Sequence, residues 1–391
     1  MTAQDPRTIA ARTGVDQDTA HGAVMPPLYL SSNYSFAGFQ QKRQYDYSRS
    51  GNPTRDLLAE TLAELEAGAG AVVVATGMAA VDLALVTLEP GDLLIAPHDC
   101  YGGTCRLLCA RAKKGHFEVL FIDQADPEAL EAALALKPKL VFIETPSNPL
   151  LRVVDIADIC TRAHVAGAKV VTDNTFLSPA LQQPIRLGAD FVVHSTTKYI
   201  NGHSDVVGGA VVCADPDDHA LLSWWANCLG VTGSPFDAYL TLRGVRTLFA
   251  RIERQQTTAG MIAAALDAHP AVKAVHYPGL KSHPGHALAA RQQNGPGAML
   301  SFELHGGVDA VREVVEALAL FTLAESLGGV ESLIAHPATM THAAMTLEQR
   351  TVAGITDGLL RLSVGLEHQD DLLADLSRAL ARVAVREAEA A

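Results

Sequence analysis

Residues 169–199 read KVVTDNTFLSPALQQPIRLGADFVVHSTTKY. Two β-branched apolar runs, 169–172 and 191–194, stand on either side of a segment long enough for a crossover connection. Runs that are almost continuously apolar are typical of strands buried on both faces of a parallel sheet. Each run ends in polar residues, with Asp173 after the first and Lys198 shortly after the second. Because the carboxyl ends of such strands form the ligand-binding edge of an open α/β sheet, we expect these residues to share a crevice.

The same texture extends to both sides of this stretch. Further short apolar runs lie at residues 71–75, 93–96, 118–122, 139–143 and 208–213. Most are separated by helix-length segments, so the pattern predicts a doubly wound α/β fold with a seven-stranded, mainly parallel sheet. Further along the chain the strands become fewer and more widely spaced. That change predicts a smaller C-terminal α+β domain.

The beginning of the chain has neither a helical nor a strand period. It contains Pro26-Pro27 and the aromatic and basic stretch QKRQYDYSRSGNP at residues 41–53. Such a segment has no core of its own and is expected to lie as an arm on another surface. We therefore predict an arm at 1–52, an α/β domain at 53–245 and an α+β domain at 246–391.

The bulk composition narrows the function classes. The net charge of −13 and the pI of about 5.6 disfavour a nucleic-acid partner. No apolar run is long enough for a membrane span, and the N-terminus lacks a signal-peptide core. None of the six cysteines has CxxC spacing, and the HPGH motif at 283–286 has no apparent third ligand, so we expect no metal site. The expected location is the cytoplasm.

Lys198 is the first candidate for chemistry. A lone lysine is usually a solvated surface charge, but this one follows the hydroxyls of Ser195 and Thr197 at a strand end. Hydroxyls suit a phosphate, and a lysine suits an aldehyde. Asp173, at the end of the neighbouring strand, is suited to hold a pyridine nitrogen protonated, although aspartate also often serves as a turn or cap residue.

A third motif lies at a predicted strand-to-helix turn near the start of the α/β domain. The run 71–75 leads into Thr76-Gly77-Met78. A glycine at a strand-to-helix turn lets backbone N–H groups approach an anion at the helix start. The motif is not GxGxxG, so a nicotinamide oxidoreductase is poorly supported.

These motifs lead to a family resemblance. DFVVHSTTKYINGHS, residues 190–204, resembles at every position the cofactor-lysine signature of the transsulfuration enzymes, the pyridoxal-phosphate (PLP) dependent cystathionine synthases and lyases of Cys/Met metabolism. Matching runs extend the resemblance over nearly the whole chain, at 47–55, 76–78, 96–104, 144–156, 170–176, 202–209 and 323–333. The resemblance implies an aminotransferase-like, type I PLP fold.

The resemblance implies roles for the cofactor-binding residues. Lys198 matches the lysine that holds pyridoxal 5'-phosphate as a Schiff base, and Asp173 matches the partner of the pyridine nitrogen. Tyr101 matches a tyrosine that stacks on the cofactor ring and assists catalysis. The residues that match the phosphate cradle are Gly77, Met78, Ser195 and Thr197.

The resemblance also implies an assembly. Tyr47 and Arg49 match residues that are donated to the cofactor phosphate of a neighbouring subunit. This role explains why a coreless arm carries them. The expected state is a homotetramer, built from dimers that share active sites.

Substrate contacts follow by the same resemblance. Arg361 matches the arginine that forks onto the substrate α-carboxylate, a task suited to guanidinium geometry. Glu325 occupies a position where an acidic group favours chemistry at Cγ over chemistry at Cβ. Four further residues match or border the substrate site: Asn148, Ser326, Arg106 and Asn227.

Within the family the likeness is greatest to the γ-synthases, with the cystathionine γ-lyases close behind. The first implies γ-replacement that joins an O-acylhomoserine, expected to be the O-succinyl ester, to cysteine. The second implies cleavage of cystathionine to cysteine, 2-oxobutyrate and ammonia. Ser50 favours the lyase, because some synthases have a second arginine there. A non-catalytic binding subunit is a distant alternative, against which Lys198, Asp173 and Arg361 argue.

Overall fold

The computed structural model describes residues 4–343 and 345–390. The chain divides into two compact units. The first comprises Met1–Glu89 and Ile156–Phe249, and the second comprises Pro90–Asp155 and Ala250–Ala391. The boundaries expected at residues 52 and 245 are a separate, sequence-based division and stay a prediction.

The predicted α/β fold with seven strands in its main sheet is confirmed. The strand order is β1-β7-β6-β5-β4-β2-β3. Strand β7 is antiparallel to both β1 and β6, whereas β5 and β6, and β2 with β3 and β4, run parallel. The strands are β1 (Gly70–Val74), β2 (Leu93–Pro97), β3 (Glu118–Ile122), β4 (Leu140–Glu144), β5 (Lys169–Asp173), β6 (Phe191–His194) and β7 (Gly209–Cys213).

A smaller sheet of five strands lies in the second unit, in the order β10-β11-β12-β9-β8. Four of its strands fall in short apolar runs that the sequence suggests as strands, at residues 272–277, 298–304, 319–323 and 360–364. The fifth, Leu333–Ala335, is too short to show a period in the sequence and is recognised only through its pairing with β10 and β12. The strands are β8 (Val272–His276), β9 (Met299–Leu304), β10 (Thr322–Leu323), β11 (Leu333–Ala335) and β12 (Leu359–Ser363).

Helix α2 of the first unit begins at a well-formed cap. The Asn52 side chain accepts from the Thr54 and Arg55 N–H groups at the start of α2. Leu58, Leu62 and Leu65 of this helix are buried. The helices are α1 (Pro6–Arg12), α2 (Pro53–Glu66), α3 (Gly77–Ala84), α6 (Ile156–Val165), α7 (Ser178–Leu181), α8 (Pro216–Leu229) and α9 (Pro235–Val245), with 3-10 turns η1 (Leu85–Thr87) and η2 (Pro184–Leu187).

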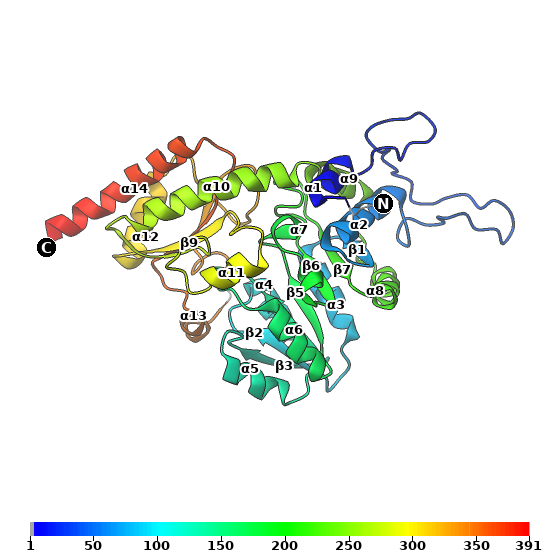
Figure 1. The fold of residues 1–391 in the computed structure, drawn as a ribbon, viewed down its shortest axis with the longest axis horizontal. Helices are drawn as coiled ribbons and strands as arrows, with labels where there is room; N and C mark the ends of the chain where they lie inside the picture. Colours follow the sequence, from blue (N-terminus) through cyan, green and yellow to red (C-terminus); the bar gives the residue numbers. More distant parts are fainter. Residues whose placement is uncertain (1–3, 344, 391) are drawn as a thin grey trace. The chain divides into compact units, whose positions relative to one another are not determined.

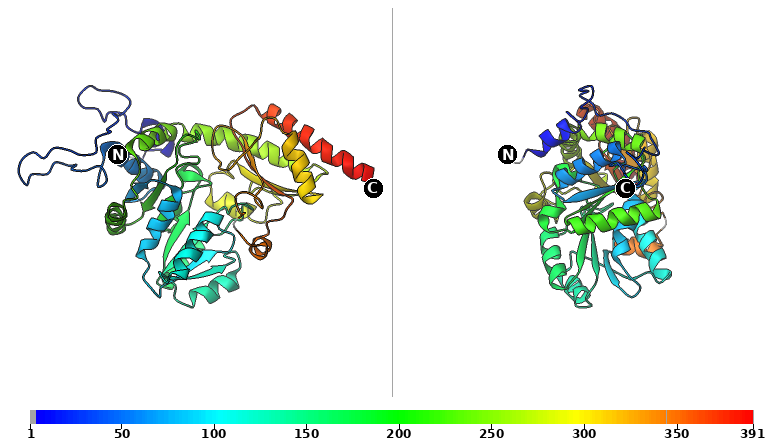
Figure 2. Two further views of the ribbon diagram at one scale, coloured as in Figure 1. Left: turned by 180° about the vertical axis from the view of Figure 1, so that it is seen from behind. Right: turned by 90° about the vertical axis from the view of Figure 1, so that its right-hand side faces the viewer.

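The segment between α1 and α2 has the character of an arm. In Figure 1, and from behind in Figure 2, it runs as long loops away from α1, α2 and α9. Several of its apolar side chains are exposed, including Leu30 and Phe39, the latter with 91% of its surface accessible. Its base is held by Arg55, whose guanidinium donates to the Ser48 carbonyl over 2.6 Å.

In the second unit, α12 and α14 pack together beside the small sheet (Figure 1), joined by Arg378 donating to the Ala317 carbonyl over 2.7 Å. The helices are α4 (Gly102–Lys113), α5 (Pro127–Leu134), α10 (Leu248–Asp267), α11 (His286–Gln292), α12 (Gly307–Ala317), α13 (Leu347–Ala353) and α14 (Gln369–Ala390), of which α10 starts within the first unit.

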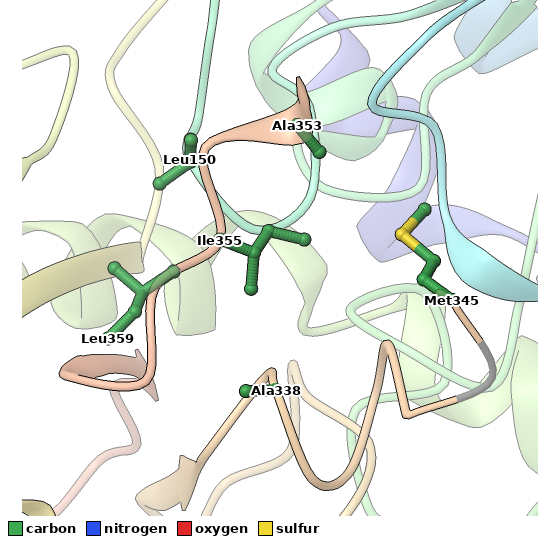
Figure 3. Close-up of a cluster of buried hydrophobic side chains, with 6 residues drawn as sticks. All are labelled: Leu150, Ala338, Met345, Ala353, Ile355 and Leu359. Carbon is green, nitrogen blue, oxygen red and sulfur yellow. The ribbon is translucent and has the colours of Figure 1, made fainter. Parts of the chain in front are cut away.

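A buried apolar cluster supports the loop that follows β4. Figure 3 shows Leu150, from this loop, gathered with side chains of the segment 338–359. The cluster consists of Leu150, Ala338, Met345, Ala353, Ile355 and Leu359. None of the helices within the described residues is both long and apolar enough to cross a membrane.

Candidate functional site

Lys198 lies in a tight turn just beyond β6. Its backbone N–H donates to the Ser195 carbonyl over 3.2 Å, and its carbonyl accepts from the Gly202 N–H over 2.7 Å. The side chain is half-buried. The turn therefore presents a lysine from a fixed backbone at the carboxyl end of a strand, where ligands bind in open α/β sheets.

The structure brings Gly77 and Ser195 together, although they are far apart in the sequence. A Cβ on Gly77 would lie 2.6 Å from Ser195 Cβ and 2.9 Å from its Oγ. Helix α3 starts at Gly77, and the Thr76 hydroxyl accepts from the Ala79 N–H over 2.9 Å. The N–H groups of Gly77 and Met78 are then the remaining donors at the helix start. Backbone donors beside a hydroxyl form a cradle for an anion.

The other hydroxyls near this cradle are anchored to the backbone. The Ser195 N–H donates to the Thr175 hydroxyl over 2.9 Å. The Thr197 hydroxyl accepts from the Gly208 N–H over 2.9 Å and donates to the Gly208 carbonyl over 3.3 Å. The turn between β6 and β7 is therefore held closed around the predicted phosphate-binding residues.

Asp173 is the last residue of β5. Its Oδ1 accepts from the Thr175 N–H over 2.9 Å, so it also serves as a turn residue. Loss of hydration raises the pKa of Asp173, against the opposing hydrogen bonds of Thr175 and the charge of His194. A cationic pyridinium beside this carboxyl group would favour its ionised form.

A buried contact fixes the strand ends that carry these residues. His194 Nε2 lies 2.7 Å from Glu66 Oε1, and both side chains are fully inaccessible. The Asn174 amide donates to the same oxygen over 2.8 Å. One carboxylate on α2 thus ties the end of β5 to the end of β6. Glu66 cannot be identified from the sequence, because its helix position gives no signal beyond the burial pattern.

Tyr101 lies in the second unit as the N-cap of α4, with 40% of its surface exposed. Its backbone N–H donates to Glu144 Oε2 over 2.8 Å. The ring lies against the glycine turn, since a Cβ on Gly103 would lie 2.4 Å from its Cε1. Tyr101 is therefore held at its backbone and limited on one side of its ring.

Arg361, expected to fork onto a carboxylate, is in the middle of β12 and only 3% exposed. Its guanidinium donates to Asn148 Oδ1 over 3.0 Å and to the Ser326 carbonyl over 2.9 Å. Ser326 has a φ of +84°, in the left-handed region that costs a residue with a side chain free energy. The structure thus brings together three of the residues predicted to bind substrate.

His342 is a member of this group that the sequence did not reveal. Its Nε2 is 3.1 Å from the Asn148 carbonyl and its Nδ1 is 2.8 Å from the Thr341 hydroxyl. Burial and the charge of Arg361 lower the pKa of His342 to about 4. The imidazole is then neutral at pH 7. It donates a hydrogen bond from Nε2 to the Asn148 carbonyl and accepts one at Nδ1 from the Thr341 hydroxyl.

The arm residues Tyr47 and Arg49 are exposed and lie together in the first unit. The Arg49 guanidinium carbon is 5.6 Å from the centre of the Tyr47 ring. The Arg49 guanidinium also donates two hydrogen bonds to Asn227 on α8, one to the Asn227 carbonyl over 2.8 Å and one to the Asn227 side-chain oxygen over 3.0 Å. Asn227, predicted to border the substrate pocket, is thereby joined to a predicted phosphate-binding residue.

Two predicted residues are not joined to the others. Glu325 and Arg106 are exposed, and neither side chain forms a hydrogen bond or ion pair with the part of the chain that the structure describes. Their roles stay predictions.

The donor set of the first unit fits pyridoxal phosphate. The cradle at Gly77 and Ser195 suits a phosphate, the Asp173 carboxyl suits a pyridine nitrogen, and the Lys198 amine suits an aldehyde. A side chain at Gly77 would fill the cradle, which gives a physical reason for glycine there.

Comparison with known proteins finds relatives over most of the chain. A profile of the Cys/Met metabolism PLP-dependent enzymes matches residues 7–381. A cystathionine gamma-synthase of Escherichia coli (strain K12) is 60% identical, over 94% of this chain and 96% of that protein.

Solved structures of cystathionine enzymes are similar to this chain over nearly its whole length. Cystathionine gamma synthase from Xanthomonas oryzae pv. oryzae, in complex with aminoacrylate and cysteine, has a TM-score of 0.97 and 63% identity, covering 98% of this chain and 100% of that one. A cystathionine gamma-lyase from Lactobacillus plantarum, complexed with L-serine, has a TM-score of 0.94 and 41% identity, covering 97% and 99%.

Proposed function

The chain belongs to the Cys/Met metabolism PLP-dependent enzymes, and we propose that it joins an O-acylhomoserine to cysteine to form cystathionine. The acyl group we propose is succinyl. The relatives from Escherichia coli and Xanthomonas oryzae, 60% and 63% identical to this chain, are both named cystathionine gamma-synthase. The Xanthomonas oryzae protein has been solved with cysteine and with cystathionine bound.

One structural observation carries the choice of an amino-acid substrate, and it is the Arg361 guanidinium. Burial at 3% exposure makes an arginine costly unless it has partners. Its guanidinium donates to Asn148 Oδ1 and to the Ser326 carbonyl, so two segments of the second unit fix its position. A planar guanidinium fixed in this way matches the two oxygens of an α-carboxylate.

The roles of the chain's own residues follow from this. When bound, PLP supplies an electron sink for charge that develops at the substrate Cα. Arg361 holds the α-carboxylate, and Asp173 keeps the pyridine nitrogen protonated. Lys198 would move one proton at a time, first at Cα and, once its amine is free of that proton, at Cβ. The C–O bond at Cγ would break with both electrons going to the acyloxy group, which leaves as the acid anion, and the cysteine thiolate would form the new C–S bond at Cγ. Lys198 would then return one proton to Cβ and one to Cα. For Tyr101, Glu325, Arg106 and Asn227 we propose the catalytic and substrate-binding roles that the family resemblance implies.

Cystathionine γ-lyase activity is the second candidate, and Ser50 favours it. Its hydroxyl donates to Asp46 Oδ1 over 2.9 Å and to the Tyr47 carbonyl over 2.8 Å, so it contributes no positive charge to the arm. The higher identity to the synthases supports the first candidate. We keep γ-replacement as the proposed main reaction.

We also propose a homotetramer located in the cytoplasm. The exposed apolar side chains of the arm support assembly, because large exposed apolar surfaces often mark contact sites. Trp224 on α8, 58% exposed, is a further large apolar side chain open to solvent. The cysteines form no disulfide among the described residues, which agrees with a reducing compartment.

The test compares two reactions of the PLP-loaded enzyme. One measures kcat/KM for O-succinylhomoserine with cysteine, and the other measures kcat/KM for cystathionine alone. The proposal expects the first value to be clearly larger. Faster cleavage of cystathionine to 2-oxobutyrate would replace the proposal with the lyase assignment.

A further inference from the structure

Glu144 is a buried carboxylate that receives two backbone hydrogen bonds from separate segments. It is the last residue of β4 and 8% exposed. Its Oε2 accepts from the Tyr101 N–H over 2.8 Å, and its Oε1 accepts from the Asn148 N–H over 3.0 Å. Hydrogen bonds to a charged acceptor are stronger than neutral ones. One side chain therefore ties the start of α4 to the loop after β4.

The first of these bonds fixes Tyr101. This residue caps α4, yet its side chain makes no capping hydrogen bond. Its carbonyl accepts from the Cys105 N–H over 3.0 Å, so Glu144 holds the other end of the same residue. With Gly103 against one side of the ring, the backbone bond to Glu144 sets the direction in which the ring can stand.

The second bond fixes Asn148, which in turn holds Arg361. Asn148 is 4% exposed and makes contacts on three sides. Its N–H donates to Glu144, its carbonyl contacts His342 Nε2 at 3.1 Å, and its Oδ1 accepts from Arg361 over 3.0 Å. The guanidinium position therefore depends on an amide whose backbone is anchored by Glu144.

We propose that Glu144 is a positioning residue that fixes the Tyr101 ring and the Arg361 guanidinium through these two backbone bonds. The proposal rests on the proposed function for what Tyr101 and Arg361 bind. A carboxylate suits the task because it has two acceptor oxygens and no donor, whereas an amide has only one acceptor. Glu144→Gln thus keeps the size of the side chain and turns a donor toward one of the two N–H groups.

A matched control exists in the same unit. Glu367 also accepts two hydrogen bonds, from the Ser332 N–H and hydroxyl, both over 2.7 Å. These hydrogen bonds of Glu367 reach neither Tyr101 nor Asn148. Glu367→Gln therefore repeats the chemical change away from the site.

The first measurement is amide hydrogen exchange of the PLP-loaded enzyme, read at Tyr101 and Asn148. Glu144→Gln should speed exchange at one or both of these amides by roughly 10-fold or more, the scale of a lost hydrogen bond to a charged group. Glu367→Gln should leave both unchanged. Unaltered exchange in Glu144→Gln would show that the two bonds do not form in solution and would overturn the proposal.

The second measurement follows the absorbance of the bound cofactor during titration with L-alanine and with L-alaninamide. Only L-alanine offers a carboxylate to Arg361. Glu144→Gln should raise the Kd of L-alanine by roughly 10-fold or more and change that of L-alaninamide much less, while Glu367→Gln changes neither. Glu144→Asp, which keeps both acceptor oxygens on a shorter side chain, should recover part of the L-alanine affinity.

Equal effects on both ligands would mean that Glu144 supports the fold without positioning Arg361. Fast amide exchange in Glu144→Gln together with unchanged Kd values for both ligands would also show that Glu144 does not position Arg361. Neither titration uses a homoserine ester, so the proposal is judged even if turnover assays contradict γ-replacement.

Discussion

Arg49 and Asn227 are joined by two hydrogen bonds, from the Arg49 guanidinium to the Asn227 carbonyl over 2.8 Å and to its side-chain oxygen over 3.0 Å. Asn227 lies on α8, whereas Arg49 belongs to the exposed arm. The two hydrogen bonds hold the long, flexible Arg49 side chain in one direction on the surface of the first unit. A guanidinium held in place loses less entropy when it binds an anion.

If Arg49 serves the cofactor phosphate of a neighbouring subunit, two inactive variants should complement each other. Arg49→Ala lacks the donated guanidinium, and Lys198→Ala lacks the lysine. Mixed oligomers of the two should recover part of the activity, because one site in such a dimer keeps both residues. Confirmed mixed oligomers without any recovery would contradict a shared site.

Gly77→Ala should weaken cofactor binding. Its Cβ would lie 2.6 Å from Ser195 Cβ, so Ser195 or the helix start has to move. Overpacking of this kind costs roughly 1–3 kcal/mol, and we expect a Kd for PLP at least 10-fold higher by equilibrium dialysis. Gly260→Ala on α10 is the control, since its Cβ would meet only the Tyr277 hydroxyl, at 3.9 Å. Equal PLP affinity in both variants would show that the Gly77 turn is not part of the phosphate site.

Glu66→Ala should destabilise the fold strongly. It leaves His194 and Asn174 without their shared acceptor in a fully buried place. We expect a loss of about 3–5 kcal/mol in the free energy of unfolding, measured in urea on the transition that reports the first unit. Glu64→Ala, on the exposed face of the same helix, should change it by less than about 0.5 kcal/mol. Similar values for the two variants would argue against the buried contact.

Acid should destabilise the protein partly through His342. Its pKa is lowered from 6.5 to about 4 in the folded chain. Between these values the unfolded chain binds a proton that the folded chain does not, so stability falls as the pH falls from about 6.5 to 4. The contribution is about 3 kcal/mol. His283, whose pKa is also lowered to about 4, adds to the same trend.

His342→Gln keeps an N–H donor for the Asn148 carbonyl and removes the titration. Urea midpoints of this variant should therefore fall less steeply between pH 7 and pH 4 than those of the parent. His305→Gln, at an exposed histidine, should behave like the parent. An unchanged pH slope in His342→Gln would mean that this histidine does not stay neutral in the fold.

The parts of the site that could be predicted from the sequence are those tied to strand ends. Asp173 and Lys198 follow apolar runs, and the carboxyl ends of parallel strands share an edge, so period alone places them. Gly77 could be located in a turn, but its contact with Ser195 depends on packing between α3 and the end of β6, which no local pattern specifies.

The missed residues act through tertiary contacts. Glu144 ends the apolar run of β4 and begins the family-matching run 144–156. The sequence signal for it is therefore a carboxylate at the end of a strand expected to be buried. His342 and Glu66 contact partners 194 and 128 residues away, and nothing near them in the sequence marks those partners. The three-residue strand β11 was missed because its length is below that at which a period is visible.

The assignment of Lys198 as the cofactor lysine is tested by identifying the lysine that binds PLP covalently. The PLP-loaded protein is reduced with borohydride, digested and sequenced by tandem mass spectrometry, with Lys198→Ala treated in parallel. We expect a reduced pyridoxyl group on Lys198 in the parent and none in the variant. A pyridoxyl group on another lysine in the active parent, or an equal yield in Lys198→Ala, would contradict it.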